Sequence, residues 1–294
     1  MRDLRVKVNG IELQVREHEN KGDAIIFLHF GGSNLMMWQR VLPYFQNNYR
    51  LIMPDLRGHG RSDAPQGSYH IDEMAQDIAA LMNALGIEKA HILGSSLGAE
   101  VGLSLAARFP EKALSLICEG ALHSEYGPYG LWEGSETEYR EHVTARLESM
   151  KNAPEDTFPS ADALLQTSQE VYEKYGWWNE YVEAVERYDI REVAAGEYVN
   201  GWEKQIRESY TKDYLEYRFE EYYKHIKCPL LMLPGEDLLQ DARAKEAMQG
   251  LSQLAKQSHI VEVNNWLHPY GWLLDPDEIC KTVLFFLEET KHAN

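Results

Sequence analysis

The sequence is poor in cysteine and in positive charge, and it lacks any long uninterrupted apolar segment. Its three cysteines, Cys118, Cys228 and Cys280, are an odd number without close spacing, which argues against a disulfide framework or a zinc knuckle. The 29 basic residues are outnumbered by 47 acidic ones, and the resulting net charge of -18 repels phosphate backbones and anionic lipid surfaces. No apolar run approaches 18 residues, so a membrane span is not indicated. We therefore expect neither a nucleic-acid nor a membrane partner.

The remaining composition is that of an ordinary globular protein. The chain has 294 residues, of which 44% are hydrophobic and 26% are charged, enough for one core with a sizeable insertion. The opening segment MRDLRVKVNG has neither the basic patch nor the apolar stretch of a targeting signal. We expect a soluble, cytoplasmic protein whose partner is a small molecule.

Apolar spacing predicts a mostly parallel sheet that begins with an antiparallel hairpin. Residues alternate between apolar and polar on both sides of Asn9-Gly10, a dipeptide typical of a two-residue hairpin turn. Short continuous apolar runs follow, separated by helix-length segments, as in strands buried on both faces. These runs are residues 25–28, 51–53, 91–93, 114–117, 229–233 and 259–263. The sequence thus predicts an α/β fold.

The alternation of strand and helix is interrupted between residues 122 and 226. This segment holds 19 of the 32 aromatic residues, and its 23 acidic residues outnumber its 11 basic ones. Ser135 and Glu138 have the spacing of a capping box, and the pattern favours further helices near 160–175, 177–191 and 202–226. We predict a helical cap at 122–226, inserted into a core domain formed by residues 1–121 and 227–294.

The strongest chemical signal is the pentapeptide GSSLG at residues 94–98. It follows an apolar run and precedes a helical stretch, which is the strand, turn and helix context that the G-x-S-x-G pattern requires. A serine on such a tight turn has its hydroxyl exposed above the sheet, while the flanking glycines let neighbouring backbone approach. Ser96 is therefore the candidate nucleophile.

A serine nucleophile needs a base and an acid that orients the base. His268 lies in the loop NNWLHPYG after the last predicted strand, which makes it the candidate base among eleven histidines. Asp237, in PGEDLL after the preceding strand, is the candidate acid. Glu236 and Asp241 are neighbouring alternatives. Glu119, at the end of the strand before the insertion, remains a further alternative from which a carboxylate could reach the histidine.

The oxyanion of an acyl-transfer reaction needs two donors, usually backbone N–H groups. Leu97, directly after Ser96, supplies the first. The second is expected from the glycine-containing loop LHFGGSN, with Gly31 as the first choice and Phe30 as the alternative.

These motifs together resemble the α/β-hydrolase superfamily, in its capped, serine-nucleophile subgroup. The resemblance rests on GSSLG, on His29 and its loop, on PDLRGHGRSD at 54–63, on PGED at 234–237 and on the His268 loop. It implies an eight-stranded sheet with the cap inserted after the sixth strand, and loop-bracing roles for Asp55, Arg57 and His59. A serine nucleophile also disfavours dehalogenase and epoxide hydrolase chemistry, for which the family uses aspartate.

The function expected from these residues is ester cleavage by a carboxylesterase-like serine hydrolase. Aromatic residues of the insertion favour a small, uncharged, hydrophobic or aromatic substrate, with Phe30, Met36 and Trp132 as candidate substrate-binding residues. No H-E-x-x-H or G-x-G-x-x-G pattern indicates a metal or an organic cofactor, so we expect none. Two alternatives stay open: a ligand sensor with slow or no turnover, and a carbon-carbon bond, amide or lactone hydrolase that uses the same triad.

Overall fold

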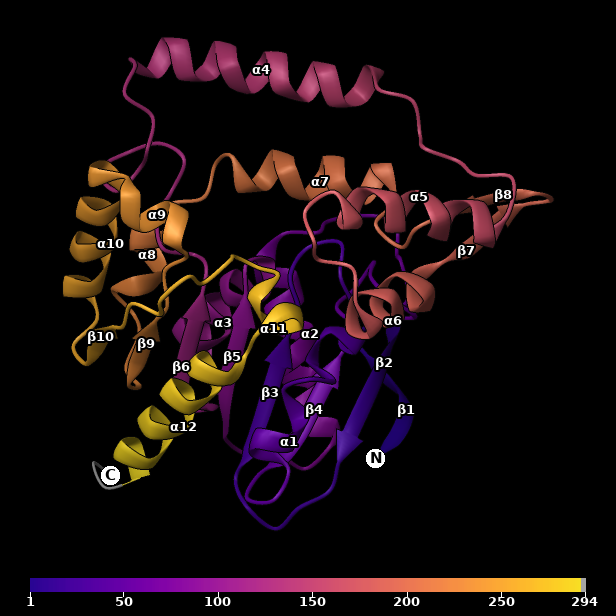
Figure 1. Ribbon diagram of the computed structural model, residues 1–294. Coiled ribbons are helices and arrows are strands. Elements are labelled where there is room, and N and C mark those ends of the chain that lie inside the picture. The colour runs from indigo at the N-terminus through magenta and orange to yellow at the C-terminus, as the bar shows by residue number, and fades with distance from the viewer. Residues whose placement is uncertain (292–294) are drawn as a thin grey trace.

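A mostly parallel sheet of eight strands runs through the centre of the computed structural model, which describes residues 1–291 (Figure 1). The strand order is β1-β2-β4-β3-β5-β6-β9-β10. Strand β2 is antiparallel to both β1 and β4, and the other neighbours are parallel. The strands are β1 (Arg2–Val8), β2 (Ile11–His18), β3 (Ala24–Leu28), β4 (Arg50–Pro54), β5 (Ala90–Ser95), β6 (Ala113–Glu119), β9 (Leu230–Met232) and β10 (Ser258–Ile260). The predicted fold class, including the N-terminal hairpin, is confirmed.

Two apolar cores lie on opposite faces of this sheet. Successive side chains of a strand point to opposite faces, so Ile26 and Leu28 of β3 join one core, and Ile25 and Phe27 join the other. The continuous apolar runs of the sequence therefore do mark strands buried on both sides. Helices on the first face are α2 (Ile71–Ala84), α3 (Leu97–Arg108), α8 (Phe219–Tyr223) and α10 (Ala242–Leu254). Helical elements on the second face are η1 (Leu35–Trp38), α1 (Leu42–Phe45), α11 (Gly271–Leu274) and α12 (Asp277–Lys291).

A mostly helical layer stands above the sheet, formed by the chain between β6 and β9 (Figure 1). Its elements are α4 (Glu136–Asn152), α5 (Ala161–Glu173), α6 (Glu180–Asp189), β7 (Arg191–Ala194), β8 (Glu197–Val199) and α7 (Lys204–Tyr214), whereas α8, the last helix before β9, packs on the first face of the sheet. The capping box predicted at Ser135 and Glu138 is present at the start of α4. The short antiparallel ribbon of β7 and β8 was not predicted, because its residues are mostly exposed and show no apolar alternation.

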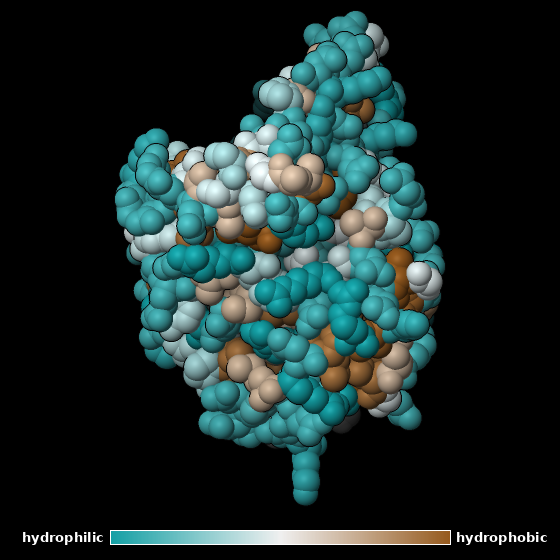
Figure 2. Space-filling view, turned by 90° about the vertical axis from the view of Figure 1, so that its right-hand side faces the viewer, coloured by the Kyte–Doolittle hydropathy of each residue, from teal (hydrophilic) through white to brown (hydrophobic). Residues whose placement is uncertain are grey.

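The surface is largely hydrophilic on the face seen in Figure 2, where apolar residues form small separate patches. In the part of the chain that the structure describes, no helix is long and apolar enough to cross a membrane.

A short helix, α9 (Glu236–Gln240), follows β9 and completes the loop region above the carboxyl ends of the strands. This region holds the candidate site.

Candidate active site

Ser96 occupies a strained turn between strand β5 and helix α3. Its backbone has φ 50° and ψ -118°, a conformation that non-glycine residues rarely adopt and that is tolerated where the surrounding structure enforces it. The flanking glycines are sterically required: a Cβ on Gly94 would lie 2.3 Å from the carbonyl oxygen of Gly98, and one on Gly98 would lie 2.0 Å from that of Leu28. The chain therefore folds into the nucleophile turn that GSSLG predicts.

Strand pairing brings Glu119 beside this turn. Strands β5 and β6 are parallel neighbours with Ser95 paired to Glu119, and the N–H of Ser96 donates to the carbonyl oxygen of Glu119 at 2.6 Å. The following residue, Gly120, has φ 120°, and a Cβ there would lie 2.8 Å from Ser96 Cα and 3.5 Å from His268 Cε1. A side chain at position 120 would therefore fill the space where the serine and the imidazole meet.

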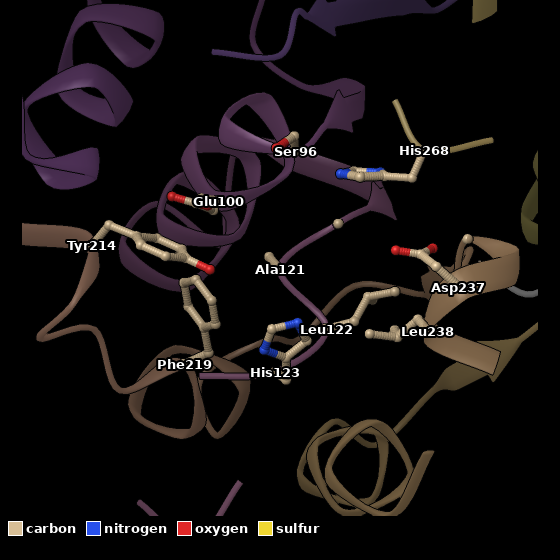
Figure 3. A pocket seen from close by; sticks show the side chains of 12 residues that line it. Ser96, Glu100, Ala121, Leu122, His123, Tyr214, Phe219, Asp237, Leu238 and His268 are labelled. Carbon is tan, nitrogen blue, oxygen red and sulfur yellow. The ribbon is translucent and has the colours of Figure 1, made fainter. Parts of the chain in front are cut away.

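His268 comes from the loop between β10 and α11, and its ring points toward Ser96 (Figure 3). Its Nδ1 is hydrogen-bonded to Oε1 of Glu119. A carboxylate at Nδ1 holds the proton on that nitrogen and leaves Nε2 free to accept one. Among the described residues no hydrogen bond joins the Ser96 hydroxyl to His268, although the ring is oriented for such a contact.

Glu119 is fully buried, and its carboxylate accepts hydrogen bonds from three further side chains. Ser95 Oγ donates to Oε2 at 2.5 Å, Trp266 Nε1 donates to Oε1 at 3.0 Å, and Trp272 Nε1 donates to Oε2 at 3.1 Å. These donors satisfy a charge whose burial would otherwise be costly. They also fix the plane of the carboxylate, so the ring of His268 is held in one orientation.

The expected partner of His268, Asp237, does not make this contact. It lies exposed in the first turn of α9, and its side chain lies near the imidazole without a hydrogen bond to it (Figure 3). The structure thus corrects the predicted pairing in favour of Glu119, which the sequence left open. Asp237 lies two residues after Gly235, in the exposed first turn of α9. Glu119 is the last residue of β6, and there its side chain reaches the loop that carries His268.

The surroundings of His268 favour its protonated form. Burial alone lowers the pKa of an imidazole, but here the negative charge and hydrogen bond of Glu119 outweigh it, with smaller contributions from Asp237 and Glu100. The net effect raises the pKa of His268 above its usual range. The ring is therefore a strong proton acceptor.

The two backbone donors expected at an oxyanion site, Leu97 and Gly31, lie in the serine turn itself and in the loop after β3. Leu97 is the first residue of α3, where the N–H groups have no partner within the helix. Gly31 lies in the loop after β3, against the indole of Trp202: a Cβ on Gly31 would lie 2.9 Å from that ring. The alternative residue, Phe30, packs edge-on against Tyr270. The roles of Leu97 and Gly31 remain predictions.

A cavity of about 130 Å³ opens directly at Ser96 and His268. Besides these two residues it is lined by Glu100, Tyr214 and Asp237, among others (Figure 3). Glu100 was not predicted, although a charged residue four positions after Ser96 in an otherwise apolar helix is a signal for it. Both of its carboxyl oxygens lie within 3.0 Å of the hydroxyl of Tyr210. Burial raises the pKa of Glu100 to about 8, so this carboxyl stays largely protonated at neutral pH.

The three candidate substrate-binding residues lie in different surroundings in the structure, and only one of them lines a cavity. Phe30 lines a second, larger cavity beneath the cap. Met36 is not among the residues lining either cavity; its sulfur accepts a hydrogen bond from Arg16 at 3.0 Å. Trp132 is absent from both linings as well and packs against Tyr139 within the cap. The geometry therefore favours only Phe30.

The segment PDLRGHGRSD ties loops together around the site. Asp55 accepts hydrogen bonds from the N–H groups of Leu35 and Arg61 at 2.7 and 2.8 Å, and from the hydroxyl of Tyr188 in the cap at 3.0 Å. Arg57 binds Asp77 through two hydrogen bonds of 2.6 and 2.9 Å. These contacts are the loop bracing that the resemblance implies.

Within residues 1–291 no group of three or more histidine, cysteine or acidic side chains is arranged to hold a metal ion.

The sequence profile of a family described as alpha/beta hydrolase fold matches residues 23–268 of this chain. The protein therefore belongs to the α/β-hydrolase family. This agrees with the sheet topology and with the serine turn between β5 and α3.

Similar proteins of the family differ in chemistry. A 3-oxoadipate enol-lactonase of Acinetobacter baylyi is 45% identical over 30% of this chain and 33% of its own length. A 2-(acetamidomethylene)succinate hydrolase of Mesorhizobium japonicum is 31% identical over 52% of this chain and 51% of its own length. The matched segments thus span a third to a half of these relatives.

Solved structures match over the whole chain at low identity. An enol-lactonase from Burkholderia xenovorans has a TM-score of 0.70 at 22% identity, covering 97% of this chain and 100% of that one. An E-2-(acetamidomethylene)succinate hydrolase has a TM-score of 0.73 at 23% identity, covering 97% and 98%. Matches at this identity support the shared fold and do not transfer a substrate.

Proposed function

We propose that the protein is a serine hydrolase that cleaves an ester bond through Ser96, His268 and Glu119. The observation that carries the proposal is the hydrogen bond between His268 Nδ1 and the buried Glu119, with the ring facing Ser96 (Figure 3). This arrangement supplies the three parts that serine-based acyl transfer needs: a nucleophile, a base and an orienting carboxylate. The family match makes hydrolysis the reaction class that this site serves best.

The reaction proceeds in two halves. His268 Nε2 takes the hydroxyl proton of Ser96 as Oγ bonds to the ester carbonyl carbon, and the N–H groups of Leu97 and Gly31 bind the resulting oxyanion. Collapse of this intermediate breaks the bond to the alcohol, which leaves with the proton from His268. A water molecule, deprotonated by His268, then attacks the acyl-enzyme and releases the acid, and the proton returns to Ser96. Glu119 keeps the imidazole in the accepting tautomer throughout.

A cyclic ester is a second candidate substrate for the same residues. Two of the proteins that resemble this chain are named as enol-lactonases, one by sequence and one by structure. Lactone opening forms and breaks the same bonds as ester cleavage, except that the alcohol stays attached to the acyl group. A test of function therefore includes a lactone beside open-chain esters.

The proposal is tested with p-nitrophenyl esters of graded chain length and with a simple aromatic lactone. We expect steady turnover by the unchanged protein and a loss of at least about a thousandfold in Ser96→Ala, because removal of the nucleophile leaves only binding and oxyanion stabilisation. Ser149→Ala is the matched control, since Ser149 is an exposed serine on α4 and far from the chemistry. It should retain full activity.

Two outcomes would overturn the proposal. A single stoichiometric burst without turnover, or tight binding of the ester without release of product, would indicate a ligand sensor on this fold. Turnover that persists in Ser96→Ala would place the chemistry elsewhere.

A further inference from the structure

A second cavity of about 390 Å³ lies between the cap and the loop that follows β3. We call it the cap cavity and define it by Phe30 and Gly31 of that loop, Trp202 and Arg207 of the cap, and Tyr270 of the loop before α11. Its volume is in the range of small-molecule sites, and its wall combines aromatic and aliphatic side chains with polar ones in about equal parts. Gly31, the candidate oxyanion donor, forms part of the wall and is the residue that relates this cavity to the proposed chemistry, whereas Ser96 and His268 line the smaller cavity.

Arg207 is the one cation among the described residues that line this cavity, and its guanidinium has no hydrogen-bond or ion-pair partner within the described chain. The neighbouring basic residues are paired: Lys204 lies 3.7 Å from Glu208, and Arg191 lies 3.3 Å from Glu203. Within residues 1–291, two other half-buried arginines, Arg40 and Arg218, also lack a carboxylate partner, but each donates to a main-chain carbonyl oxygen, which Arg207 does not. Its five donors are free to bind an oxyanion.

The acidic groups near Arg207 do not neutralise it by contact. Glu186 is the only acidic residue of the described lining; it is buried, and one oxygen accepts a hydrogen bond from Tyr172 at 3.2 Å. Burial raises the pKa of Glu186, which favours its uncharged form. Glu155 and Asp156 border an adjoining cavity that Arg207 also lines, but neither lies within 4.0 Å of the guanidinium. Among the described lining residues, Arg207 is therefore a cation that no carboxylate contacts.

We propose that the cap cavity binds the carboxylate end of the substrate, with Arg207 as the residue that pairs with it. Planar, bidentate pairing with a carboxylate is the geometry that a guanidinium favours, and the aromatic walls accommodate the apolar body that joins the carboxylate to the ester. The substrate class is then a small ester that carries a remote carboxylate. This departs from the uncharged substrate that the aromatic residues of the insertion favour, because Arg207 supplies a local positive charge. The link to Ser96 rests on the proposed function, whereas binding of the carboxylate does not.

Binding is measured on Ser96→Ala, which cannot turn over its ligand. Monomethyl suberate, which has one carboxylate and one methyl ester, is titrated by calorimetry against the neutral dimethyl suberate. We expect the half-ester to bind more tightly, and Arg207→Gln to weaken it at least about tenfold while leaving the diester unchanged, since a charge-assisted contact is lost. Lys212→Gln is the matched control: Lys212 is exposed on the same helix and does not line the cavity, yet the charge change is identical.

Equal binding of the two esters, or equal weakening by Arg207→Gln and Lys212→Gln, would overturn the carboxylate site. With Ser96 intact, Arg207→Gln should raise KM for the half-ester about tenfold and leave kcat and the diester nearly unchanged. If the half-ester binds at Arg207 but its hydrolysis is indifferent to Arg207→Gln, the cavity holds a separate effector, and the substrate assignment is wrong. If neither ester is cleaved by the unchanged protein, the proposed function fails while the titration still decides the site.

Discussion

At the scale of single residues, the site depends on which carboxylate holds the imidazole. Glu119 is buried, bonded to His268 and fixed by three other donors, whereas Asp237 is exposed and contributes only its charge at a distance. Coulombic effects of an exposed carboxylate are strongly screened by water. The geometry therefore favours Glu119 over Asp237 as the group that positions the proposed base.

A pair of amide substitutions tests this assignment. Glu119→Gln should lower kcat by a factor of about 10³ to 10⁴, because an amide at this position no longer secures the accepting tautomer of His268 or stabilises the imidazolium. Asp237→Asn, the matched control, removes a charge of the same sign near the same ring and should lower kcat less than about tenfold. Steady-state kinetics with a p-nitrophenyl ester, together with circular dichroism to verify folding, makes the comparison. A larger loss in Asp237→Asn than in Glu119→Gln would restore Asp237 as the orienting acid.

At the scale of elements, the cap differs from the core in how its helices are stabilised. Helix α4 buries only Tyr139 and Val143 among its 17 residues, so few tertiary contacts anchor it. Its N-terminus has a complete capping box, in which Ser135 and Glu138 satisfy each other's backbone N–H groups. Because α4 buries so little surface, its stability depends more on the hydrogen bonds that cap its N-terminus than the stability of a core helix does.

Loss of the capping box at the N-terminus of α4 should loosen this helix without affecting the core domain. Ser135→Ala should lower the local free energy of opening by about 1 kcal/mol, the usual cost of losing an N-cap. Hydrogen exchange of the first turns of α4 should then be about fivefold faster, while the amides of β5 and β6 are unchanged. Ser149→Ala makes the same substitution in an exposed position of the same helix and should leave these rates nearly unaltered. Equal acceleration by both substitutions would mean that packing, and not the cap, sets the stability of α4.

At the scale of the whole molecule, buried acids and buried histidines set the response to pH. Burial raises the pKa of Asp189 to about 7 and of Glu100 to about 8, so the folded state keeps protons that the unfolded chain loses near pH 4. Burial lowers the pKa of His29 to about 3 and those of His59 and His91 to about 4. Below pH 6.5 the unfolded chain binds protons at these histidines that the folded state does not bind.

These shifts predict a decline in stability from pH 6.5 to pH 8. At pH 6.5 the histidines of the unfolded chain are still about half protonated and oppose this decline, whereas above about pH 7.5 they are neutral in both states and contribute no slope. The two carboxyls bind more protons in the folded state, so the free energy of unfolding falls as pH rises, by up to about 1.4 kcal/mol per pH unit for each group. The net charge of -18 adds repulsion in the same direction. Urea unfolding at pH 6.5, 7.25 and 8 measures the slope.

Asp189→Asn isolates one of the two groups. Neither carboxyl oxygen of Asp189 has a hydrogen-bond partner, so a neutral amide removes the cost of ionising it. The slope between pH 6.5 and 8 should become shallower, whereas Asp162→Asn, at an exposed aspartate of α5, should leave it as it was. A stability that rises over this window in the unchanged protein would contradict the account.

Local patterns in the sequence predicted the strands of the core and the positions of two residues of the candidate site. Apolar runs marked the strands, the Asn9-Gly10 turn marked the hairpin, and GSSLG marked the position of Ser96, because each depends on backbone geometry over a few neighbouring residues. The loop after the last strand located His268 for the same reason. The β7 and β8 ribbon escaped prediction because its exposed residues leave no apolar pattern.

Only the tertiary structure decided how the site is completed. Three of the hydrogen bonds of Glu119 come from residues 147 to 153 positions away, Trp266, His268 and Trp272. The meeting of Glu100 with Tyr210 and the unpaired state of Arg207 likewise depend on how the cap packs on the core. Sequence periodicity records which face of an element is buried. It does not record which side chains of distant elements share that buried space, because their directions and distances are set by the packing of the whole fold.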